Sequence, residues 1–375
     1  MFRVISLSIS EVIEDVEAIV LKRENNVIIR VRSSGGKIGI GHADSCSLVK
    51  DLVEKYVKRI LIGENPLNIN KLWFKMYRDE SLWYGYRGMW IHAIAGVDMA
   101  LWDLAGKILD RPVWSLLGGR FRDKVIPYAS ISFPETEEKT REVASLYAEQ
   151  GFKAVKFGWG LFGRVSVNKN VELVKAAREG LGWNVELMVD AGRPWSATLK
   201  HMIKTVRRIE RYEPFFLEEP FAPDNFEDYR TLRRVTEIPI AGGEIFSTVT
   251  EFRRFIEDGC VDIVQPDPSR VGLTQFKEIA SIAASRGIMC IPHDWSTALN
   301  VLAQIHLVAS IPNGLYVEYH RPQGPPERAN IEKDLMDNLI IPPLELKKGF
   351  FKVPDRPGLG AELNSEVLKR LTRHI

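Results

Sequence analysis

The sequence predicts an α/β barrel that follows a smaller α+β region. Eight short apolar runs recur between residues 125 and 317, and charge-rich amphipathic stretches of helix length separate nearly all of them. In the first third of the chain, strand-like alternation gives way to a helical period. Strands that alternate with helices form a parallel sheet covered by helices, and eight such strands close into a barrel. A chain of 375 residues is long enough for one barrel-sized core and a smaller one.

The N-terminal third is predicted to be a hairpin followed by helices. The first forty residues alternate in strand fashion, and NNVIIRVRSSGGKIGIG (residues 25–41) predicts two strands joined by a Ser-Gly-Gly turn. From about residue 47 the apolar period is helical, and it continues through IHAIAGVDMALWDLAGK (residues 91–107). Gly106 is expected to mark the end of the last helix.

The eight apolar runs are the predicted barrel strands. They are residues 125–131, 154–157, 185–189, 214–217, 238–241, 261–264, 287–291 and 315–317. After residue 320, RPQGPPERAN is too rich in proline for an eighth barrel helix. The tail PDRPGLGAELNSEVLKRL (residues 354–371) predicts a loop and a short helix, which we expect to return to the N-terminal region.

The composition argues against several classes of partner. The formal charge is only +2 and basic residues are interspersed with acidic ones, so we expect neither nucleic acid nor an anionic membrane as a partner. The three cysteines lie far apart and predict neither a disulfide framework nor a zinc site. No window reaches the roughly 18 apolar residues of a membrane span, and the N-terminus does not resemble a signal peptide, so we expect a cytoplasmic protein.

Ionisable residues stand where seven consecutive predicted strands end. They are Lys156, Asp190, Glu218 (followed by Glu219), Glu244, Asp267, His293 and Glu318. The intervals are each about one strand-helix unit, and active sites of such barrels lie where strands end and loops begin. We therefore expect all seven side chains to face one mouth.

Three of these residues predict a metal site. Asp190, Glu218 and Glu244 end consecutive strands, and two carboxylates about 4 Å apart repel by roughly 4 kcal/mol at an effective dielectric of about 20. A cation must offset that repulsion. Oxygen ligands without cysteine or clustered histidine favour Mg²⁺, ahead of Mn²⁺ or Ca²⁺. The alternative is that these carboxylates cap helices or pair with arginines.

The next two residues predict a general base. Asp267 and His293 end neighbouring strands, so the carboxylate can hold one ring nitrogen protonated and raise the basicity of the other. The alternative is a histidine that only fills a polar corner at the end of a strand.

Ordered motifs along the whole chain resemble a known family. They are GVDMALWDLAGKILDRPVWSLLGG (residues 96–119), GFKAVKFG, VDAG, EEP, GGE, QPDPSRVGL, PHDWS and PGLGAEL. This order and spacing is similar to that of the enolase superfamily, within its mandelate racemase subgroup. The resemblance implies a (β/α)₇β modified TIM barrel over residues 124–344. It also implies an α+β capping domain over residues 1–123 that is completed by residues 345–375.

The resemblance further implies a reaction. One Mg²⁺ per subunit would be held by Asp190, Glu218 and Glu244, and a proton α to a substrate carboxylate would be abstracted to give an enediolate. His293 and Asp267 match the family's catalytic dyad, and Glu318 matches a glutamate that binds the substrate carboxylate or the enediolate. A homo-oligomer acting on a small carboxylic acid is implied as well.

The second barrel strand departs from the family pattern. Many relatives carry a Lys-x-Lys pair there, and the second lysine is a base on the opposite face of the substrate. Here Lys156 matches the first lysine, Gly158 occupies the second position, and Lys153 lies too near the start of the strand to replace it. A racemase that transfers a proton across one carbon needs two bases, so we expect a one-base enzyme.

One-base relatives are typically acid-sugar dehydratases, that is, hydro-lyases. We therefore expect removal of the α-proton of an aldonate by His293 and loss of the β-hydroxyl, giving a 2-keto-3-deoxy acid. Lys156 would neutralise the substrate carboxylate, although it could also merely pair with the metal-site carboxylates. The alternatives are a racemase or epimerase of an α-substituted acid, and a non-catalytic binding protein. Cycloisomerases rank low because Asp267 stands where they usually carry a lysine.

Candidate substrate-binding residues are fewer. Gly192 replaces an asparagine that touches substrate in many relatives, so Arg193 or Trp195 is expected to take its part. In SLWYGYRGMW, Tyr84 and Arg87 fall in a segment that corresponds to capping loops over the substrate. The alternative for both is packing at the domain interface.

Overall fold

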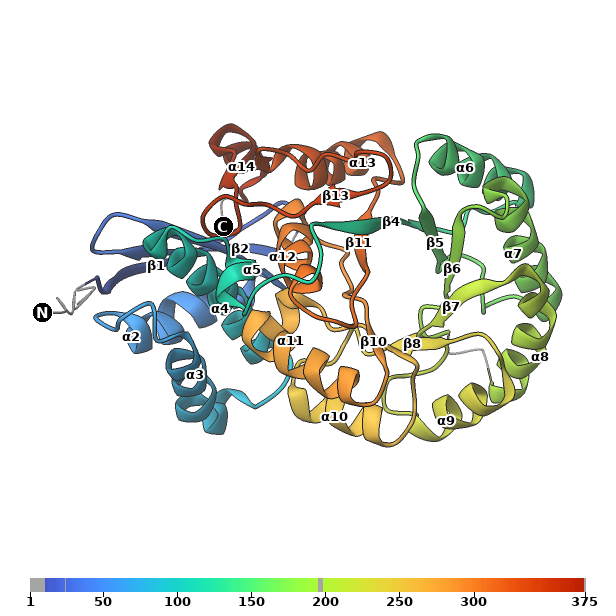
Figure 1. The fold of residues 1–375 in the computed structure, drawn as a ribbon, viewed down its shortest axis with the longest axis horizontal. Helices are drawn as coiled ribbons and strands as arrows, with labels where there is room; N and C mark the ends of the chain where they lie inside the picture. Colours follow the sequence, from blue (N-terminus) through green and yellow to red (C-terminus); the bar gives the residue numbers. More distant parts are fainter. Residues whose placement is uncertain (1–10, 24, 195–197, 374–375) are drawn as a thin grey trace, which may run out of the picture.

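The computed structural model describes residues 11–23, 25–194 and 198–373. Figure 1 shows the N-terminal elements on one side of a ring of strands, which helices surround. Among the described residues, we find no helix with the length and apolar character needed to cross a membrane.

The N-terminal region, residues 11–116, is an antiparallel sheet packed on helices. Strands β1 (Ile13–Val20), β2 (Asn26–Ser33) and β3 (Ile38–Asp44) pair in the order β1-β2-β3, so the predicted hairpin is the β2–β3 pair. The helices are α1 (Leu48–Leu52), the π-helical η1 (Val53–Val57), α2 (Lys58–Leu61), α3 (Ile69–Tyr84), α4 (Met89–Leu109) and α5 (Val113–Leu116).

Helix α4 connects the two regions because it packs against β3 on one side and against a barrel helix on the other. A Cβ atom at Gly41 would lie 2.1 Å from the carbonyl oxygen of Gly96, so the close approach of β3 to α4 requires glycine there. The expectation that Gly106 ends this helix is wrong, since α4 continues to Leu109 and ends at the left-handed Asp110. Gly106 instead gives room to the C-terminal tail, because its Cβ would lie 2.6 Å from the Cα atom of Gly358.

All eight predicted barrel strands are present. They are β4 (Lys124–Ser132), β5 (Ala154–Gly158), β6 (Glu186–Asp190), β7 (Pro214–Glu218), β8 (Ile240–Gly242), β9 (Ile263–Val264), β10 (Met289–Cys290) and β11 (Tyr316–His320). Seven helices follow the first seven strands in turn: α6 (Glu137–Glu149), α7 (Val167–Leu181), α8 (Leu199–Ile209, continued by the 3₁₀ turn η2, Glu210–Tyr212), α9 (Phe226–Val235), α10 (Val249–Glu257), α11 (Pro268–Ser285) and α12 (Ala298–Ala309).

The strands form a filled barrel. Parallel pairing runs in the order β10-β9-β8-β7-β6-β5-β4-β11, and the amide of Cys290 donates to the carbonyl of Asn313, just before β11, at 3.0 Å. One buried cluster takes a residue from, or next to, every strand: Tyr128, Ala154, Met188, Phe216, Ala241, Ile263, Ile291 and Tyr316. These side chains occupy the barrel interior, so the mouth has a packed floor.

The chain after β11 begins with the proline-rich stretch that was expected not to form an eighth barrel helix. A short helix, α13 (Pro326–Lys333), starts within this stretch and is followed by the π-helical η3 (Asp334–Asn338). Proline is tolerated in the first helical turn, where its missing N–H has no helical partner. The tail then adds β12 (Ile340–Ile341), β13 (Phe351–Lys352), β14 (Glu362–Leu363) and α14 (Ser365–Leu371).

The tail returns to the N-terminal region, as predicted. The amide of Lys22 donates to the carbonyl of Leu371 at 2.7 Å, and the amide of Val113 donates to the carbonyl of Gly358 at 2.9 Å. On the way, β13 pairs with β4 of the barrel.

Candidate active site

The seven ionisable residues gather at one end of the barrel. Lys156 lies in β5 and Glu318 in β11, Asp190 and Glu218 are the last residues of β6 and β7, and Glu244, Asp267 and His293 come two or three residues after β8, β9 and β10. Asp190 and Glu218 are register partners on adjacent strands. All seven are buried, and none is more than 6 % exposed. A cluster of this charge inside a protein must be paired.

His293 and Asp267 form a hydrogen-bonded pair. The ring nitrogen Nδ1 of His293 lies 2.8 Å from Oδ2 of Asp267. The other carboxylate oxygen of Asp267 accepts from the amide and hydroxyl of Ser269, at 2.9 and 2.6 Å, and from Nδ2 of Asn300 at 3.0 Å. Asp267 is therefore fixed in place, and it fixes the imidazole with Nε2 facing Glu244 Oε2 at 3.4 Å.

The surrounding carboxylates favour the protonated imidazole. Burial alone would lower the pKa of His293, but Glu244, Glu318 and Asp267 outweigh it and raise the pKa to about 10. Burial likewise raises the pKa of Asp267, yet its hydrogen bond to His293 and the charges of His293 and Arg270 hold that pKa well below its usual value. Asp267 therefore stays ionised and accepts a hydrogen bond from the protonated Nδ1 of His293.

Lys156 is held between two other carboxylates. Its ammonium lies 2.7 and 2.9 Å from the two oxygens of Glu218 and 2.8 Å from Oε1 of Glu318. Burial disfavours the charged amine, but Glu218 and Glu318 outweigh it and raise the pKa of Lys156 well above its usual value. Lys156 is therefore a permanent cation at the mouth. Its contact with Glu218 is the pairing with a metal-site carboxylate that was the alternative for this residue.

The three candidate metal ligands contact hydrogen-bond donors and cations. Oδ1 of Asp190 accepts from the amide of Gly192 at 2.6 Å, Glu218 binds Lys156, and Glu244 lies 3.4 Å from both Arg193 Nη2 and His293 Nε2. Within the described ranges, no three acidic, histidine or cysteine side chains stand close enough to hold a metal ion as they are.

The chemistry of the donor set nevertheless fits a hard cation. Burial raises the pKa of Asp190 to about 6, and Lys156 only partly offsets this effect. Burial also raises the pKa of Glu218 well above its usual value, and the neighbouring Asp190 adds to that rise. Asp190 and Glu218 are thus two adjacent buried acids whose ionised forms are disfavoured. A divalent cation stabilises the ionised forms, and hard cations bind oxygen ligands such as these.

Two residues at the mouth were not predicted from the sequence. Arg270 donates through Nη1 to the carbonyl of Glu244 at 2.8 Å, and its Nε lies 4.0 Å from Oδ2 of Asp267. Oδ2 of Asp44, in β3, accepts a hydrogen bond from Nη2 of the same guanidinium at 2.7 Å. The available signal for Arg270 was its place three residues after Asp267, within one helical turn.

The candidate substrate-binding residues separate into two groups. Arg193 and Arg87 line a cavity of about 950 Å³ between the loop before α4 and the loops after β5–β8. The amide of Gly88 donates to the hydroxyl of Ser247 at 2.9 Å and holds that loop against the barrel. Tyr84 instead packs against Tyr56 and Trp90 in the N-terminal region, with its ring centroid 4.6 and 5.1 Å from theirs and the rings tilted. Trp195 lies outside the described residues.

Gly158, at the position of the family's second lysine, has little room for a side chain. A Cβ atom there would lie 2.7 Å from Oδ2 of Asp190, so this carboxylate occupies the space that a side chain would need. Lys153 points elsewhere, with its ammonium 4.3 Å from the centre of the Phe350 ring.

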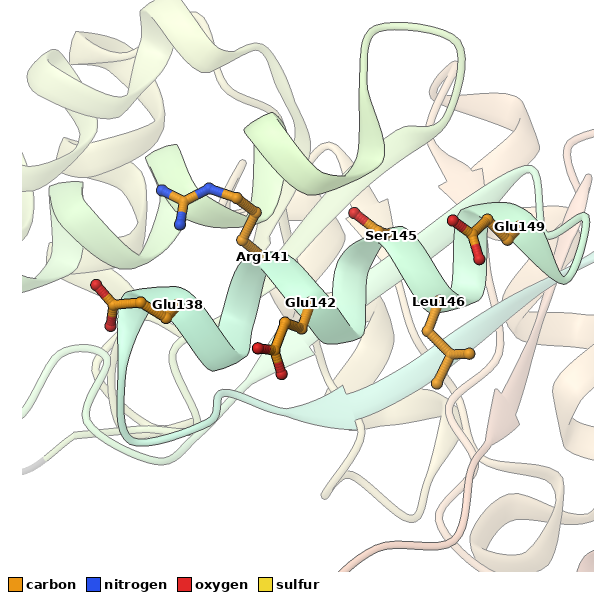
Figure 2. A pocket seen from close by; sticks show the side chains of 6 residues that line it. All are labelled: Glu138, Arg141, Glu142, Ser145, Leu146 and Glu149. Atoms are coloured by element: carbon orange, nitrogen blue, oxygen red, sulfur yellow. The ribbon is translucent and has the colours of Figure 1, made fainter.

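A second hollow, of about 550 Å³, lies along the outer face of α6. Figure 2 shows that it is lined by Glu138, Arg141, Glu142, Ser145, Leu146 and Glu149, which all come from this one helix. Arg141 is already paired with Glu179 of α7 at 2.6 Å. This hollow contains none of the seven mouth residues and is lined by a single helix, so we do not assign the active site to it.

Comparisons with known proteins identify the family of the whole chain. Residues 16–118 match the mandelate racemase/muconate lactonizing enzyme N-terminal domain, and residues 138–367 match the enolase C-terminal domain-like family. The chain is 33 % identical to an arabinonate dehydratase of Saccharolobus solfataricus over 92 % of this chain and 89 % of that one. It is 30 % identical to a D-xylonate dehydratase of Haloferax volcanii, over 92 % of this chain and 84 % of that one.

A solved structure extends the likeness. The 3,6-anhydro-D-galactonate cycloisomerase of Zobellia galactanivorans is 30 % identical and superposes with a TM-score of 0.86, over 96 % of this chain and 99 % of that one. The two family matches span both regions of the fold, and the relatives cover nearly the whole chain. The chain therefore belongs to the mandelate racemase/muconate lactonizing enzyme group of the enolase superfamily.

Proposed function

We propose that this protein is a Mg²⁺-dependent hydro-lyase that removes water from an aldonate and forms a 2-keto-3-deoxy acid. The observation that carries the proposal is the asymmetry of the mouth. It offers one histidine fixed by a carboxylate, His293 with Asp267, and a glycine, Gly158, where a second base would stand. Its relatives among dehydratases of arabinonate and D-xylonate support the choice of an aldonate.

The proton transfers follow from the geometry around His293. Asp267 keeps Nδ1 protonated, so Nε2 is the nitrogen that takes the proton from C2 of the substrate. The electron pair of the C2–H bond moves into the carboxylate and gives an enediolate. When the C3–O bond breaks, the protonated Nε2 returns its proton to the leaving hydroxyl, and water departs. The resulting enol becomes the 2-keto acid.

Lys156 and Glu318 are the residues that would receive the substrate carboxylate. Lys156 is a fixed cation, and Glu318 is oriented through Oε2 by the amide of Asp294 at 2.8 Å. Because the negative charge of the enediolate gathers on the carboxylate oxygens, a fixed cation there stabilises the transition state more than the ground state.

Asp190, Glu218 and Glu244 would hold Mg²⁺. The ion, when bound, supplies Lewis-acid stabilisation of the enediolate oxygens. Their present contacts with Gly192, Lys156, Arg193 and His293 would be partly exchanged for the ion. Glu244 is the largest of the charges that raise the pKa of His293, so a cation held by Glu244 would oppose that rise.

Four further features of the protein stay predictions. We propose a capping domain over residues 1–123 and 345–375 and a barrel domain over residues 124–344, supported by the contacts of the tail with Lys22 and Val113. Arg193 and Arg87 are proposed to contact the far end of the substrate from the cavity that they line. The homo-oligomeric state rests on the family resemblance, and the cytoplasmic location rests on the sequence alone.

A screen of aldonates tests the function. Purified protein with Mg²⁺ is incubated with a panel of C5 and C6 aldonates, and 2-keto-3-deoxy acids are detected by a colour reaction. We expect turnover of at least one aldonate and its loss in a chelator. Incorporation of solvent deuterium at C2 with the hydroxyl retained would indicate an epimerase instead. Turnover of 3,6-anhydro acids alone would favour a cycloisomerase, the activity named for the solved relative.

A further inference from the structure

A buried ion pair joins the N-terminal region to the mouth. Nε and Nη2 of Arg270, in the first turn of α11, lie 3.1 and 2.7 Å from Oδ2 of Asp44, the last residue of β3. Their side chains are only 18 % and 8 % exposed. Oδ1 of Asp44 accepts in addition from Nδ2 of Asn25 at 2.8 Å. One carboxylate therefore holds both the turn between β1 and β2 and the start of a barrel helix.

The same guanidinium reaches two parts of the candidate site. Nη1 donates to the carbonyl of Glu244 at 2.8 Å and so fixes the backbone of a proposed metal ligand. Nε lies 4.0 Å from Oδ2 of Asp267, the oxygen that His293 contacts. Arg270 thus contacts the N-terminal region, the loop after β8 and the catalytic dyad at once, which its planar set of five donors allows.

The backbone around Arg270 is arranged for this contact. Asp267 caps the helix and Pro268 starts it, but Gly272 interrupts it with φ 75° and ψ 167°. A Cβ atom at Gly272 would lie 2.7 Å from Oδ2 of Asp98 in α4, so this turn packs tightly on the N-terminal region. The turn from 268 to 271 is therefore set off from the rest of α11 and presents Arg270 toward the mouth.

We propose that Arg270 and Asp44 are positioning residues, through which the N-terminal region holds Glu244 and Asp267 in their working arrangement. The inference rests on the proposed function and extends it to residues that are not among the proposed metal ligands, the catalytic dyad or the proposed substrate contacts. Simple adhesion between the regions is a weaker explanation, because a buried ion pair adds little net stability compared with apolar packing.

A nearby contact across the same interface provides a matched control. The hydroxyl and amide of Thr274 in α11 donate to Asp98 of α4 at 2.6 and 2.9 Å. Thr274 lies beyond the interruption at Gly272, and its other described partner is Trp102 of α4 rather than a residue of the mouth. Thr274→Val should therefore weaken the interface without disturbing the site.

The experiment compares Asp44→Asn, Arg270→Lys and Thr274→Val in the full-length protein. For each we measure kcat and KM with the aldonate that the wild type dehydrates, Mg²⁺ affinity by calorimetry without substrate, and Tm. We expect Asp44→Asn and Arg270→Lys to lower kcat about 10- to 100-fold and Mg²⁺ affinity about 10-fold, as removal of partners behind metal ligands does, with a smaller change in KM. Thr274→Val should lower Tm while kcat stays within about twofold.

Two results would overturn the inference. The first is wild-type kcat and Mg²⁺ affinity in whichever of Asp44→Asn and Arg270→Lys folds. The second is an equal loss of kcat in Thr274→Val at the same loss of Tm, which would assign the effect to the interface as a whole. If the wild type dehydrates no aldonate, the proposed function fails, while the substrate-free Mg²⁺ titration still tests the positioning role.

Discussion

The two sides of the mouth use similar groups in different ways. On the β9–β10 side, Asp267 binds one nitrogen of His293, and the other nitrogen faces only a longer contact of 3.4 Å with Glu244. On the β5–β11 side, three carboxylate oxygens surround the ammonium of Lys156 at 2.7–2.9 Å. A group that is fully paired remains a charge, whereas one that is half paired can exchange a proton. The degree of pairing, more than the residue type, separates the two roles.

The largest effect should come from removal of the half-paired group. We expect His293→Asn to lower kcat about 10³- to 10⁴-fold, because the base that takes the C2 proton is lost while the volume and polarity of the side chain are roughly kept. Turnover of the aldonate is measured by release of 2-keto-3-deoxy acid, and Mg²⁺ affinity by calorimetry.

Mg²⁺ affinity separates the base from the metal site. His293→Asn should leave it within a few-fold of the wild type, whereas Glu244→Gln should weaken both metal binding and turnover. A His293→Asn variant with normal kcat would refute this comparison, since proton transfer would then not depend on the half-paired imidazole.

Substitution of Lys156, the fully paired group, should first of all lower the stability of the fold. Lys156→Met removes the cation between Glu218 and Glu318 and leaves two buried carboxylates without it, which should lower the free energy of unfolding by about 3–5 kcal/mol. Urea unfolding measures the change. Lys153→Met is the control, because this exposed lysine of the same segment lies over the face of Phe350, makes no ion pair among those described, and should change stability by less than about 1 kcal/mol. Equal effects of the two substitutions would contradict the pairing described for Lys156.

A histidine away from the mouth shows what is particular to His293. His306 of α12 is also buried, but it accepts at Nδ1 from the amide of Trp114 at 3.2 Å and donates from Nε2 to the carbonyl of Leu359 at 2.9 Å. Burial lowers the pKa of His306 to about 4, although the bond to Leu359 partly opposes this effect. With no carboxylate contact among its described bonds, the same side chain is kept neutral.

The two directions of pKa shift give a testable pH dependence. The folded pKa of His306 lies below its unfolded value of about 6.5, so its contribution to stability is complete above pH 6.5 and is lost as the pH falls toward 4. The wild type should lose about 2 kcal/mol through this residue between pH 7 and pH 5. Urea unfolding at both pH values should show a loss that is smaller by that amount in His306→Gln. An equal loss in both proteins would mean that His306 is protonated in the folded state.

Much of this fold was predictable because period and spacing determine it. Eight apolar runs separated by amphipathic stretches predicted all eight barrel strands, and the same spacing brought Asp190 and Glu218 onto neighbouring strand ends, where they are register partners. The dyad followed in the same way, because β9 and β10 are adjacent and each is followed by one of its residues.

The details that the sequence did not predict depend on contacts between distant segments. Gly106 does not end α4, because its role is to admit Gly358 of the tail, which no local pattern reveals. The contact of Arg270 with Asp44 could not be predicted, since Asp44 is 226 residues earlier in the chain. The pairing of Lys156 with Glu318 likewise depends on the return of β11 beside β4.

The smallest expected effect concerns Gly158, the position that makes the two sides unequal. Gly158→Ala adds only a Cβ atom, which would lie 2.7 Å from Oδ2 of Asp190 and should displace that acid by a fraction of an ångström. We expect Mg²⁺ affinity to fall about tenfold, equivalent to about 1.4 kcal/mol, with little change in Tm.

Gly158→Lys should show the same loss of Mg²⁺ affinity and no solvent deuterium at C2 of recovered substrate, measured by NMR. Its side chain would begin in space that Asp190 occupies. It would also lie beside the ammonium of Lys156, which is already fully paired with carboxylates. Appearance of the C2 epimer in this variant would instead mean that the glycine alone prevents two-base chemistry, and that the surrounding mouth is otherwise ready for it.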